Sequence, residues 1–183
     1  MENVAIIGAG GWGLALANIF SEKHHIKVWV HSEESYNNLN KFHKNDNYLN
    51  NIELNKEIQF SMELGEVIND AKIVIIVTPS FAFHNTCENI EPYISNEQII
   101  ISATKGLDRN TGKTMSEVAR SIISGDVNIL TLSGPSHAEE VAKGVPTAVV
   151  IGGEKGISEY VRDTLTVPPK FRIYNSTDQK GVE

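Results

Sequence analysis

The amino-acid sequence predicts an α/β protein built on a doubly wound, mostly parallel sheet with helices on both faces. Short, nearly continuous runs of β-branched residues are typical of strands buried on both faces, as in a parallel sheet. Longer segments compatible with helices separate these runs, which favours βαβ units. A glycine-rich turn follows the first run directly and opens an apolar helix, as in the first βα unit of such a sheet.

Six runs predict buried strands, and two weaker runs predict further strands. The six are residues 4–7, 26–30, 73–77, 99–102, 128–132 and 148–151, and the weaker two are 58–60 and 171–174. Thr111 and Ser136 are residue types that begin helices, and they precede the fifth and sixth helical segments. The helical segments are 12–23, 33–44, 62–69, 82–90, 114–124, 137–143 and 156–164.

Composition excludes several classes of protein. The 183 residues carry 16 basic and 23 acidic side chains, a formal charge of −7, which argues against nucleic acid as a partner. The length favours one domain, and 40% apolar residues argue against disorder. Cys87 is the single cysteine, so we expect a reducing compartment. Glu2 and the short apolar run at residues 4–7 do not fit a secretory signal, so we expect none, and no apolar run approaches the roughly 20 residues that span a bilayer. We therefore expect a cytoplasmic protein with no membrane partner.

Residues 8–13, with the sequence GAGGWG, fit the G-x-G-x-x-G pattern of a Rossmann-like dinucleotide-binding turn. Gly8 permits the tight turn, Gly10 lets a pyrophosphate approach the main chain, and Gly13 lets the helix pack closely on the strand. The free amides and the positive end of the helix dipole would hold the phosphates. A Walker-type loop is excluded, because no Gly-Lys-Ser/Thr follows. The alternative is a tight turn without a ligand.

The choice between NAD and NADP stays open. An NAD site usually places an acidic residue about 20 positions beyond the glycine loop. Here His31 and Ser32 follow the second strand, and Glu33 and Glu34 come after them. His31 and Ser32 would accommodate a 2′-phosphate or border the adenosine, and a surface position is the alternative for His31. We expect tolerance of both cofactors.

Three more turns follow buried strands. Lys105 stands after residues 99–102, at the edge where doubly wound sheets bind ligands. Its ammonium group would neutralise a substrate phosphate or polarise a carbonyl during hydride delivery, or it is a solvated turn residue. Ser136 follows a Gly-Pro pair and suits an anionic or hydroxylic ligand or, as the alternative, a helix cap. Residues 78–80 (TPS) are expected near the nicotinamide, unless ordinary turn chemistry explains them.

The other reactive side chains predict neither a metal site nor a nucleophile. His24, His25, His43 and His84 lack metal-ligand spacing with a cysteine or carboxylate, so we expect them at the surface. Cys87 lies in an apolar helix, where packing is its expected role. The G-x-S-x-G elbow of serine hydrolases is absent.

Taken together, these segments resemble bacterial NAD(P)-dependent glycerol-3-phosphate dehydrogenases. The lysine turn and the Gly-Pro-Ser segment, in this order after the glycine loop, are more specific than the loop alone. The resemblance implies reversible hydride transfer between NAD(P)H and dihydroxyacetone phosphate, which gives sn-glycerol 3-phosphate for phospholipid synthesis. It runs end to end and rests on GAGGWG at 8–13, NYL at 47–49, PS at 79–80, TKGL at 104–107, SGPSHAEE at 133–140, GVPT at 144–147 and FRIY at 171–174.

The resemblance also implies roles for individual residues. Lys105 would be the catalytic residue of this stretch and would touch both cofactor and substrate, while Gly134 and Ser136 would contact the substrate. The sequence departs from the family at three places: glycine replaces serine or threonine at position 11, histidine stands at 31 where arginine is common nearby, and histidine replaces phenylalanine at 137. The implied cofactor contacts are Gly8, Gly10, Gly11, Trp12, Gly13, His31, Ser32, Tyr48, Lys105 and Ala138.

Members of this family continue after the GVE at residues 181–183 into a helical substrate domain, whose early segment carries the proton-transfer lysine. We therefore expect residues 1–183 to be a dinucleotide-binding domain, with the helical domain absent from this chain, that binds dinucleotide but reduces dihydroxyacetone phosphate negligibly. A rival hypothesis is a non-catalytic dinucleotide-binding module that senses redox state. We also expect exposed apolar surface at residues 149–151 or on the last strand, which would favour a homodimer.

Overall fold

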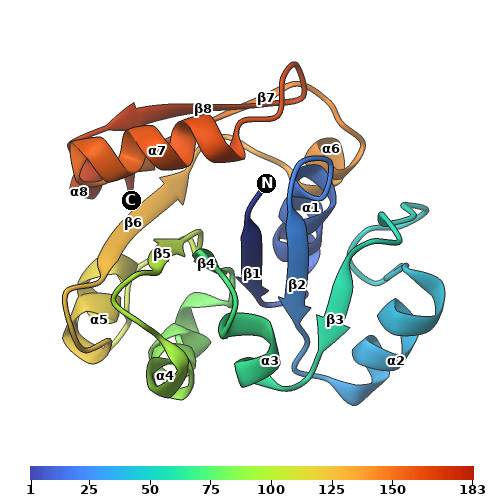
Figure 1. The fold of residues 1–183 in the computed structure, drawn as a ribbon, viewed down its shortest axis with the longest axis horizontal. Coiled ribbons are helices and arrows are strands. Elements are labelled where there is room, and N and C mark those ends of the chain that lie inside the picture. Colours follow the sequence, from blue (N-terminus) through green and yellow to red (C-terminus); the bar gives the residue numbers. More distant parts are fainter.

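The computed structural model describes every residue from Met1 to Glu183, and its strands form one eight-stranded sheet. The strands lie in the order β3-β2-β1-β4-β5-β6-β7-β8 (Figure 1). All eight predicted strands are present and differ from the prediction only at their ends. Their bounds are β1 Asn3–Ile7, β2 His25–Trp29, β3 Gln59–Ser61, β4 Ile73–Ile76, β5 Ile99–Ser102, β6 Asn128–Ser133, β7 Thr147–Gly152 and β8 Phe171–Ser176.

Strand direction and order fix where a ligand can bind. Neighbouring strands from β3 to β6 all pair parallel, whereas β7 pairs antiparallel to β6 and β8 runs parallel to β7. The carboxyl ends of six strands therefore share one edge of the sheet. The chain order reverses at β1, which lies between β2 and β4. Crevices at such a reversal bind ligands in doubly wound folds.

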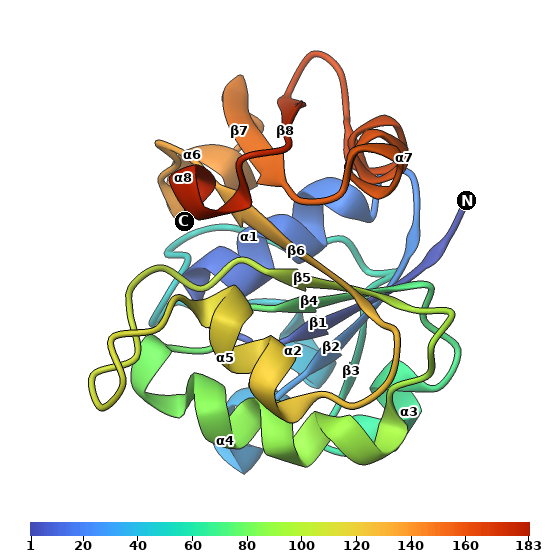
Figure 2. The ribbon, with the colours of Figure 1, turned by 90° about the vertical axis from the view of Figure 1, so that its left-hand side faces the viewer.

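Helices cover both faces of the sheet, which confirms the doubly wound, mostly parallel fold (Figure 2). All seven predicted helices are present. A 3₁₀ turn at Glu91–Tyr93 and the short helix α8 were not predicted. The bounds are α1 Gly11–Phe20, α2 Glu33–Phe42, α3 Leu64–Ile68, α4 Ser80–Ile90, α5 Met115–Ile122, α6 Ala138–Ala142, α7 Lys155–Leu165 and α8 Gln179–Val182.

Two apolar cores, one on each face, hold these layers together. Side chains alternate along β1, so Val4 and Ile6 join a cluster with residues of α1, α6 and α7. Ala5 and Ile7 join a second cluster with residues of α3, α4 and α5. The strands are apolar at consecutive positions because both of their faces are buried. The core therefore anchors β1 and β4 firmly beneath the turns at their carboxyl ends.

Two predicted helix starts are wrong. Helix α5 is capped by Thr114 instead of Thr111, because Thr114 Oγ1 accepts from the Glu117 amide at 3.4 Å and Glu117 Oε2 accepts from the Thr114 amide at 2.9 Å. The Thr111 hydroxyl instead donates to Asp108 Oδ2 at 2.6 Å within the preceding turn. Helix α6 begins after His137, so Ser136 does not cap it.

The short helix α8 is held by tertiary contacts. The Glu183 carboxylate accepts hydrogen bonds from the Ser116 amide at 2.8 Å and the Ser116 hydroxyl at 2.7 Å. Arg120 donates to Gln179 Oε1 at 2.6 Å. A segment of four residues carries no readable helical period, so its structure depends on these contacts with α5.

The apolar surface expected near the end of the chain is present only in part. Val149 and Ile151 are 1% and 0% exposed, and Phe171 and Ile173 on β8 are equally covered. Residues of α7 belong to the same apolar cluster and bury them. The other sides of β7 and β8 leave Ala148 exposed, Val150 half-buried and Tyr174 57% exposed, so part of the expected apolar surface is present on the last strand and the homodimer stays a prediction. No helix is both long enough and apolar enough to cross a membrane.

Candidate functional site

A crevice of about 860 Å³ lies at the carboxyl edge of the sheet, where β1 neighbours β4. The glycine loop, the ends of β2 and β4, the lysine turn after β5 and the start of α6 all line it. The sequence separates these segments by more than 100 residues, and the parallel register brings them together. Most of the predicted site residues line this crevice: Gly8, Gly10, Gly11, Trp12, His31, Ser32, Tyr48, Lys105, Ser136 and Ala138.

Two predicted residues, Gly13 and Gly134, are not among the residues that line the crevice. A Cβ on Gly13 would collide with the Gly8 carbonyl oxygen, so Gly13 lets α1 pack against the loop, as predicted. Gly8 itself has φ +125°, a conformation that L side chains rarely adopt. A Cβ there would lie 3.0 Å from the Val77 carbonyl oxygen. Gly8 and Gly13 therefore determine the conformation of the turn and its packing against α1.

Gly10 has a different environment. It occupies the N-cap position of α1, has no side chain with which to cap the helix, and has no atom within 4 Å of the position that a Cβ would take. The first amides of a helix lack intrahelical partners, and their dipole favours negative charge. The start of α1 thus presents main-chain donors to open space in the crevice. This is a cradle that a phosphate group fits, and a side chain at Gly10 would fill it.

The side of the crevice at the end of β2 has no carboxylate on its wall. Ser32 caps α2, with its Oγ 3.4 Å from the Ser35 amide. Glu33 and Glu34 occupy the first turn of α2 but do not line the crevice. The ring centroids of His31 and Trp29 lie 5.5 Å apart. The side chains able to reach a ribose are therefore imidazole and hydroxyl groups.

Tyr48 and Ala138, which are distant in sequence, meet at Gly11. A Cβ on Gly11 would lie 3.5 Å from the Tyr48 carbonyl oxygen and 3.6 Å from Ala138 Cβ. These are ordinary van der Waals distances, so a Cβ at this position would fit with little adjustment. The meeting of these three residues closes one wall of the crevice beside α1.

On the opposite side of the crevice, the lysine turn contacts the Gly-Pro-Ser segment. Lys105 Nζ donates to the Gly134 carbonyl oxygen at 3.1 Å, and Ser136 Oγ lies 3.4 Å from the same oxygen. Thr104 Oγ1 donates to the Thr78 carbonyl oxygen at 2.7 Å, which ties the lysine turn to the end of β4. The three residues predicted to contact substrate are thus brought together. Lys105 remains exposed and has further N–H donors for a ligand.

The crevice lining contains no aspartate or glutamate, although the chain carries a net charge of −7. Lys105 is the only lysine or arginine in the lining, which also contains the imidazole rings of His31 and His137. The lining therefore suits an anion. No group of histidine, cysteine, aspartate and glutamate side chains in the molecule is arranged to hold a metal ion.

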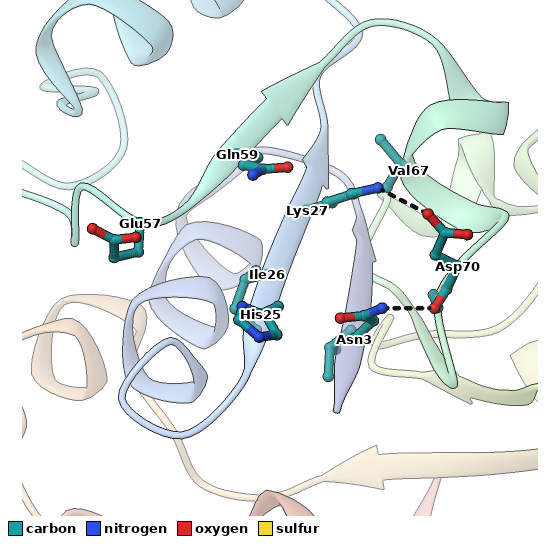
Figure 3. A pocket seen from close by; sticks show the side chains of 10 residues that line it. Asn3, His25, Ile26, Lys27, Glu57, Gln59, Val67 and Asp70 are labelled. Carbon is teal, nitrogen blue, oxygen red and sulfur yellow. Dashed lines mark hydrogen bonds and ion pairs between the residues drawn. The ribbon is translucent and has the colours of Figure 1, made fainter. Parts of the chain in front are cut away.

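A smaller hollow of about 200 Å³ lies across β1, β2 and β3 near their amino ends (Figure 3). Lys27 there faces Asp70 at 3.6 Å, and Asn3 Nδ2 donates to the Asp70 carbonyl oxygen at 3.1 Å. These polar groups are already paired within the protein. The hollow is therefore a poor candidate site beside the larger crevice.

Two expectations about reactive side chains have opposite outcomes. Burial raises the pKa of the Cys87 thiol to about 12, which agrees with a packing role in α4. His24, expected at the surface, is only 5% exposed. Its Nδ1 accepts from the Glu2 amide at 3.2 Å, and its Nε2 donates to the Thr164 carbonyl oxygen at 2.9 Å. The surface prediction failed because Thr164, on α7, is 140 residues away in sequence.

Sequence reasoning missed one wall of the crevice, which belongs to α4. Phe81, Asn85 and Asn89 recur every four residues and line the crevice together with Ala82 and Thr86. The opposite side of α4 buries Phe83, Cys87 and Ile90 in the core. The signal was the amphipathic period of this segment, whose less apolar stripe carries amides where charged side chains are usual.

Comparisons with known proteins agree with this architecture. The model of a family described as the NAD-dependent glycerol-3-phosphate dehydrogenase N-terminus matches residues 3–157. The chain is 80% identical over 183 residues to a Brachyspira hyodysenteriae protein named glycerol-3-phosphate dehydrogenase [NAD(P)+], and 33% identical over 186 residues to one of that name from Fusobacterium nucleatum. In both cases the match covers 100% of this chain and 55% of the relative.

A solved structure gives the same result. The crystal structure of glycerol-3-phosphate dehydrogenase from Coxiella burnetii superposes with a TM-score of 0.92 at 31% identity, covering 100% of this chain and 56% of that one. The chain thus spans about half the length of the proteins it matches. From the family match over most of its residues, we conclude that the chain belongs to the family of NAD-dependent glycerol-3-phosphate dehydrogenase N-termini.

Proposed function

We propose that residues 1–183 form the dinucleotide-binding domain of an enzyme that reversibly reduces dihydroxyacetone phosphate to sn-glycerol 3-phosphate with NADH or NADPH. The observation that carries this proposal is the composition of the crevice. It combines an open cradle at the start of α1, a lining without carboxylates, and Lys105 beside Gly134 and Ser136. A phosphorylated substrate and a pyrophosphate-bearing cofactor both need such an environment.

The residues divide into those that hold the cofactor and those that meet the substrate. The main chain from Gly8 to Gly13 would hold the pyrophosphate, and His31 and Ser32 would border the adenosine ribose. Gly11, Trp12, Tyr48 and Ala138 would contact the cofactor between these ends and the substrate. A bound nicotinamide cofactor supplies the hydride.

Lys105 would serve both ligands. Its contact with the Gly134 carbonyl oxygen positions the ammonium group at the crevice wall, where it would neutralise the substrate phosphate or polarise the substrate carbonyl. Gly134 and Ser136 would complete the substrate side. Transfer of the substrate proton would fall to a lysine in the helical region of the longer relatives, so residues 1–183 alone would turn over substrate negligibly.

The same lining favours tolerance of both cofactors. A carboxylate at the end of β2 would bond the ribose hydroxyls of NAD and repel the 2′-phosphate of NADP. Here the nearest acidic side chains, Glu33 and Glu34, do not line the crevice. His31, Ser32 and Ser35 offer donors to either group. We place the reaction in the cytoplasm, where its product would be a precursor of glycerophospholipids.

Calorimetric titration with NADH and NADPH, alone and with dihydroxyacetone phosphate, tests the proposal. We expect both dinucleotides to bind and dihydroxyacetone phosphate to strengthen the binding. Lys105→Met should abolish that strengthening, because the phosphate loses its cation. Lys113→Met is the matched control, since Lys113 is an exposed lysine of the following loop that does not line the crevice.

Each other outcome has a definite meaning. Binding that is indifferent to dihydroxyacetone phosphate would favour the redox-sensing module over the enzyme. Absence of dinucleotide binding by the folded protein would overturn the proposal. Normal steady-state turnover by residues 1–183 would contradict the assignment of the proton-transfer lysine to the longer relatives' additional region.

A further inference from the structure

We propose that Asn85 and Asn89 on α4 recognise the adenine base of the dinucleotide by hydrogen bonds to its amino edge, beside the indole ring of Trp29. This inference rests on the proposed function and extends it to a part of the site that no sequence motif marks. It assigns a specificity role to a helix face that the glycine loop and the lysine turn leave unexplained.

The crevice extends past the glycine loop into the space between β2 and α4. Trp29 and Val30 line it from β2, and Phe81, Asn85 and Asn89 line it from α4. Trp29 is fixed in place, because its Nε1 donates to the Met62 carbonyl oxygen at 2.9 Å and its ring packs against the apolar cluster beneath α3 and α4. This part of the crevice therefore has one rigid aromatic wall and one wall that carries amides.

The order of groups along a bound dinucleotide fixes what enters this space. Its pyrophosphate lies at the start of α1 and its adenosine ribose at the end of β2. Lys105 and Ser136 are on the other side of the glycine loop, where the nicotinamide and substrate belong. The base that continues past the ribose, away from Lys105, is adenine. The space between Trp29 and α4 is thus the adenine end of the crevice.

The two asparagines are available for a ligand. Both side chains are exposed, and neither carboxamide has a hydrogen-bond partner within the protein. Thr86 on the same face is different, since its hydroxyl is 2.9 Å from the Ala82 carbonyl oxygen and 3.2 Å from Thr78 Oγ1. The Thr86 hydroxyl is thus hydrogen-bonded within the protein, whereas the two asparagine amides remain available to a ligand in the crevice.

Helix stability does not explain asparagine at these positions. Asn is a poor helix former compared with Glu, Lys, Gln or Ala, and Asn85 lies in the middle of the eleven-residue helix, while Asn89 lies in its last turn. His84 Nδ1 and Glu88 Oε2 on α4 lie 3.6 Å apart, and neither residue lines the crevice. The amides thus occupy two positions, one turn apart, at which the helix faces the adenine end.

The chemistry of a carboxamide matches that of adenine. A carboxamide offers a donor and an acceptor side by side, and an adenine edge offers an acceptor ring nitrogen beside its amino donor. Trp29 adds an aromatic face on which a base can stack. Hydrogen bonding by Asn would select adenine over bases with a different edge, which stacking alone does not achieve.

Calorimetry with NADH and its 1,N6-etheno derivative tests the proposal, because the added ring of that derivative blocks the amino group and the adjacent ring nitrogen. We expect the native protein to prefer NADH by about tenfold or more, the order that a paired amide contributes to base discrimination. The double variant Asn85→Leu/Asn89→Leu keeps side-chain size and improves helix propensity. It should bind NADH about tenfold more weakly and the etheno derivative within about twofold of the native protein.

His84→Ala is the control, because it changes α4 on a side that does not line the crevice. The inference is overturned if the leucine variant binds NADH as the native protein does, or if its affinities for both ligands fall equally. Thermal unfolding of the variant at or above the native midpoint shows that the helix is intact. Failure of the native protein to bind NADH would instead overturn the proposed function, and this inference with it.

Discussion

The two edges of the parallel strands treat their polar groups in opposite ways. At the amino edge, His24 precedes β2 and is paired through both ring nitrogens, with the Glu2 amide and the Thr164 carbonyl oxygen. Gln98 precedes β5 and is 4% exposed, and its carboxamide makes three hydrogen bonds of 2.8 to 2.9 Å to main-chain groups. Polar groups at this edge are buried and satisfied, as a stable interior requires.

At the carboxyl edge, groups of similar chemistry remain open. The space at Gly10 is empty to 4 Å, Lys105 is exposed, and the amides of Asn85 and Asn89 have no protein partner. Within one sheet, polar groups at the amino edge therefore stabilise the fold, and those at the carboxyl edge are available to bind a ligand. Hydrogen-bonding capacity is used internally where the strands begin and left available where they end, and that edge is where doubly wound folds bind their ligands.

The largest effect that tests this comparison is expected from Gly13→Ala. The added methyl group collides with the Gly8 carbonyl oxygen, and neither main chain can move without shifting α1 against β1. We expect the free energy of unfolding, measured by chemical denaturation, to fall on the order of 3 kcal/mol. A denaturation midpoint equal to the native one would show that the loop does not need this close approach.

Gly10→Ala should separate binding from stability in the same loop. The methyl group enters open space, so the unfolding free energy should change by less than about 0.5 kcal/mol. NADH affinity should fall about tenfold or more, which corresponds to about 1.4 kcal/mol, because the methyl group occupies the phosphate cradle. Calorimetric titration of the native protein and of Gly10→Ala with NADH in the same buffer measures the two affinities. Unchanged affinity would mean that the ligand does not approach the main chain at Gly10.

The amino edge should respond to pH through His24. Burial is the main cause that lowers the pKa of His24 below its ordinary 6.5, so the unfolded chain takes up the proton more readily than the folded one. The stabilising contribution is complete above pH 6.5 and is lost as the pH falls below it. Between pH 7.5 and 5 we expect the native melting temperature to fall more steeply than that of His24→Gln.

The carboxylates with lowered pKa values do not contribute to the change in stability between pH 7.5 and 5. Hydrogen bonds to the amides of Thr114 and Ile157 lower the pKa values of Glu117 and Glu154, whose contributions are therefore lost only below their ordinary pKa of 4.5. Parallel melting curves for the native protein and His24→Gln would contradict a buried, neutral His24.

The smallest effect is expected from a pair of hydroxyls on neighbouring strands. Ser102 at the end of β5 is buried and its Oγ has no hydrogen-bond partner, whereas its register neighbour Thr131 accepts from Gln179 Nε2 at 3.2 Å. Ser102→Ala should leave the unfolding free energy unchanged or raise it by up to about 1 kcal/mol. Thr131→Val should lower it by about 1 kcal/mol, because Gln179 loses a partner. The reverse order in denaturation experiments would refute this interpretation.

Much of the fold was predictable because its signals are local. Consecutive apolar residues such as those of β4 mark strands that are covered on both faces, and the glycine spacing after β1 follows from steric limits within six residues. The same locality made most of the crevice predictable. The lysine turn and the Gly-Pro-Ser segment each follow a strand that ends at the shared edge.

The failed predictions of burial depend on partners far away in the chain, whereas the two failed helix starts are errors of one to three residues. His24 was expected at the surface, and α7 buries it; Val149 and Ile151 were expected to be exposed, and the same helix covers them. Ser136 was a candidate helix cap, but α6 begins one residue later. The asparagines of α4 were missed because the sequence does not show that this face of the helix lies across the crevice from the end of β2.

The linear order of residues by itself determined the type of sheet, the tight turn at residues 8–13 and the expectation of an anionic ligand there. Steric exclusion at the turn and burial of a strand on both faces each constrain a few neighbouring residues. They are therefore visible in the sequence as glycine spacing and as runs of consecutive apolar residues. Only the folded molecule decided which polar groups are satisfied and which face the crevice. That outcome depends on hydrogen-bond partners and packing elements that lie up to 140 positions apart, as His24 and Thr164 do.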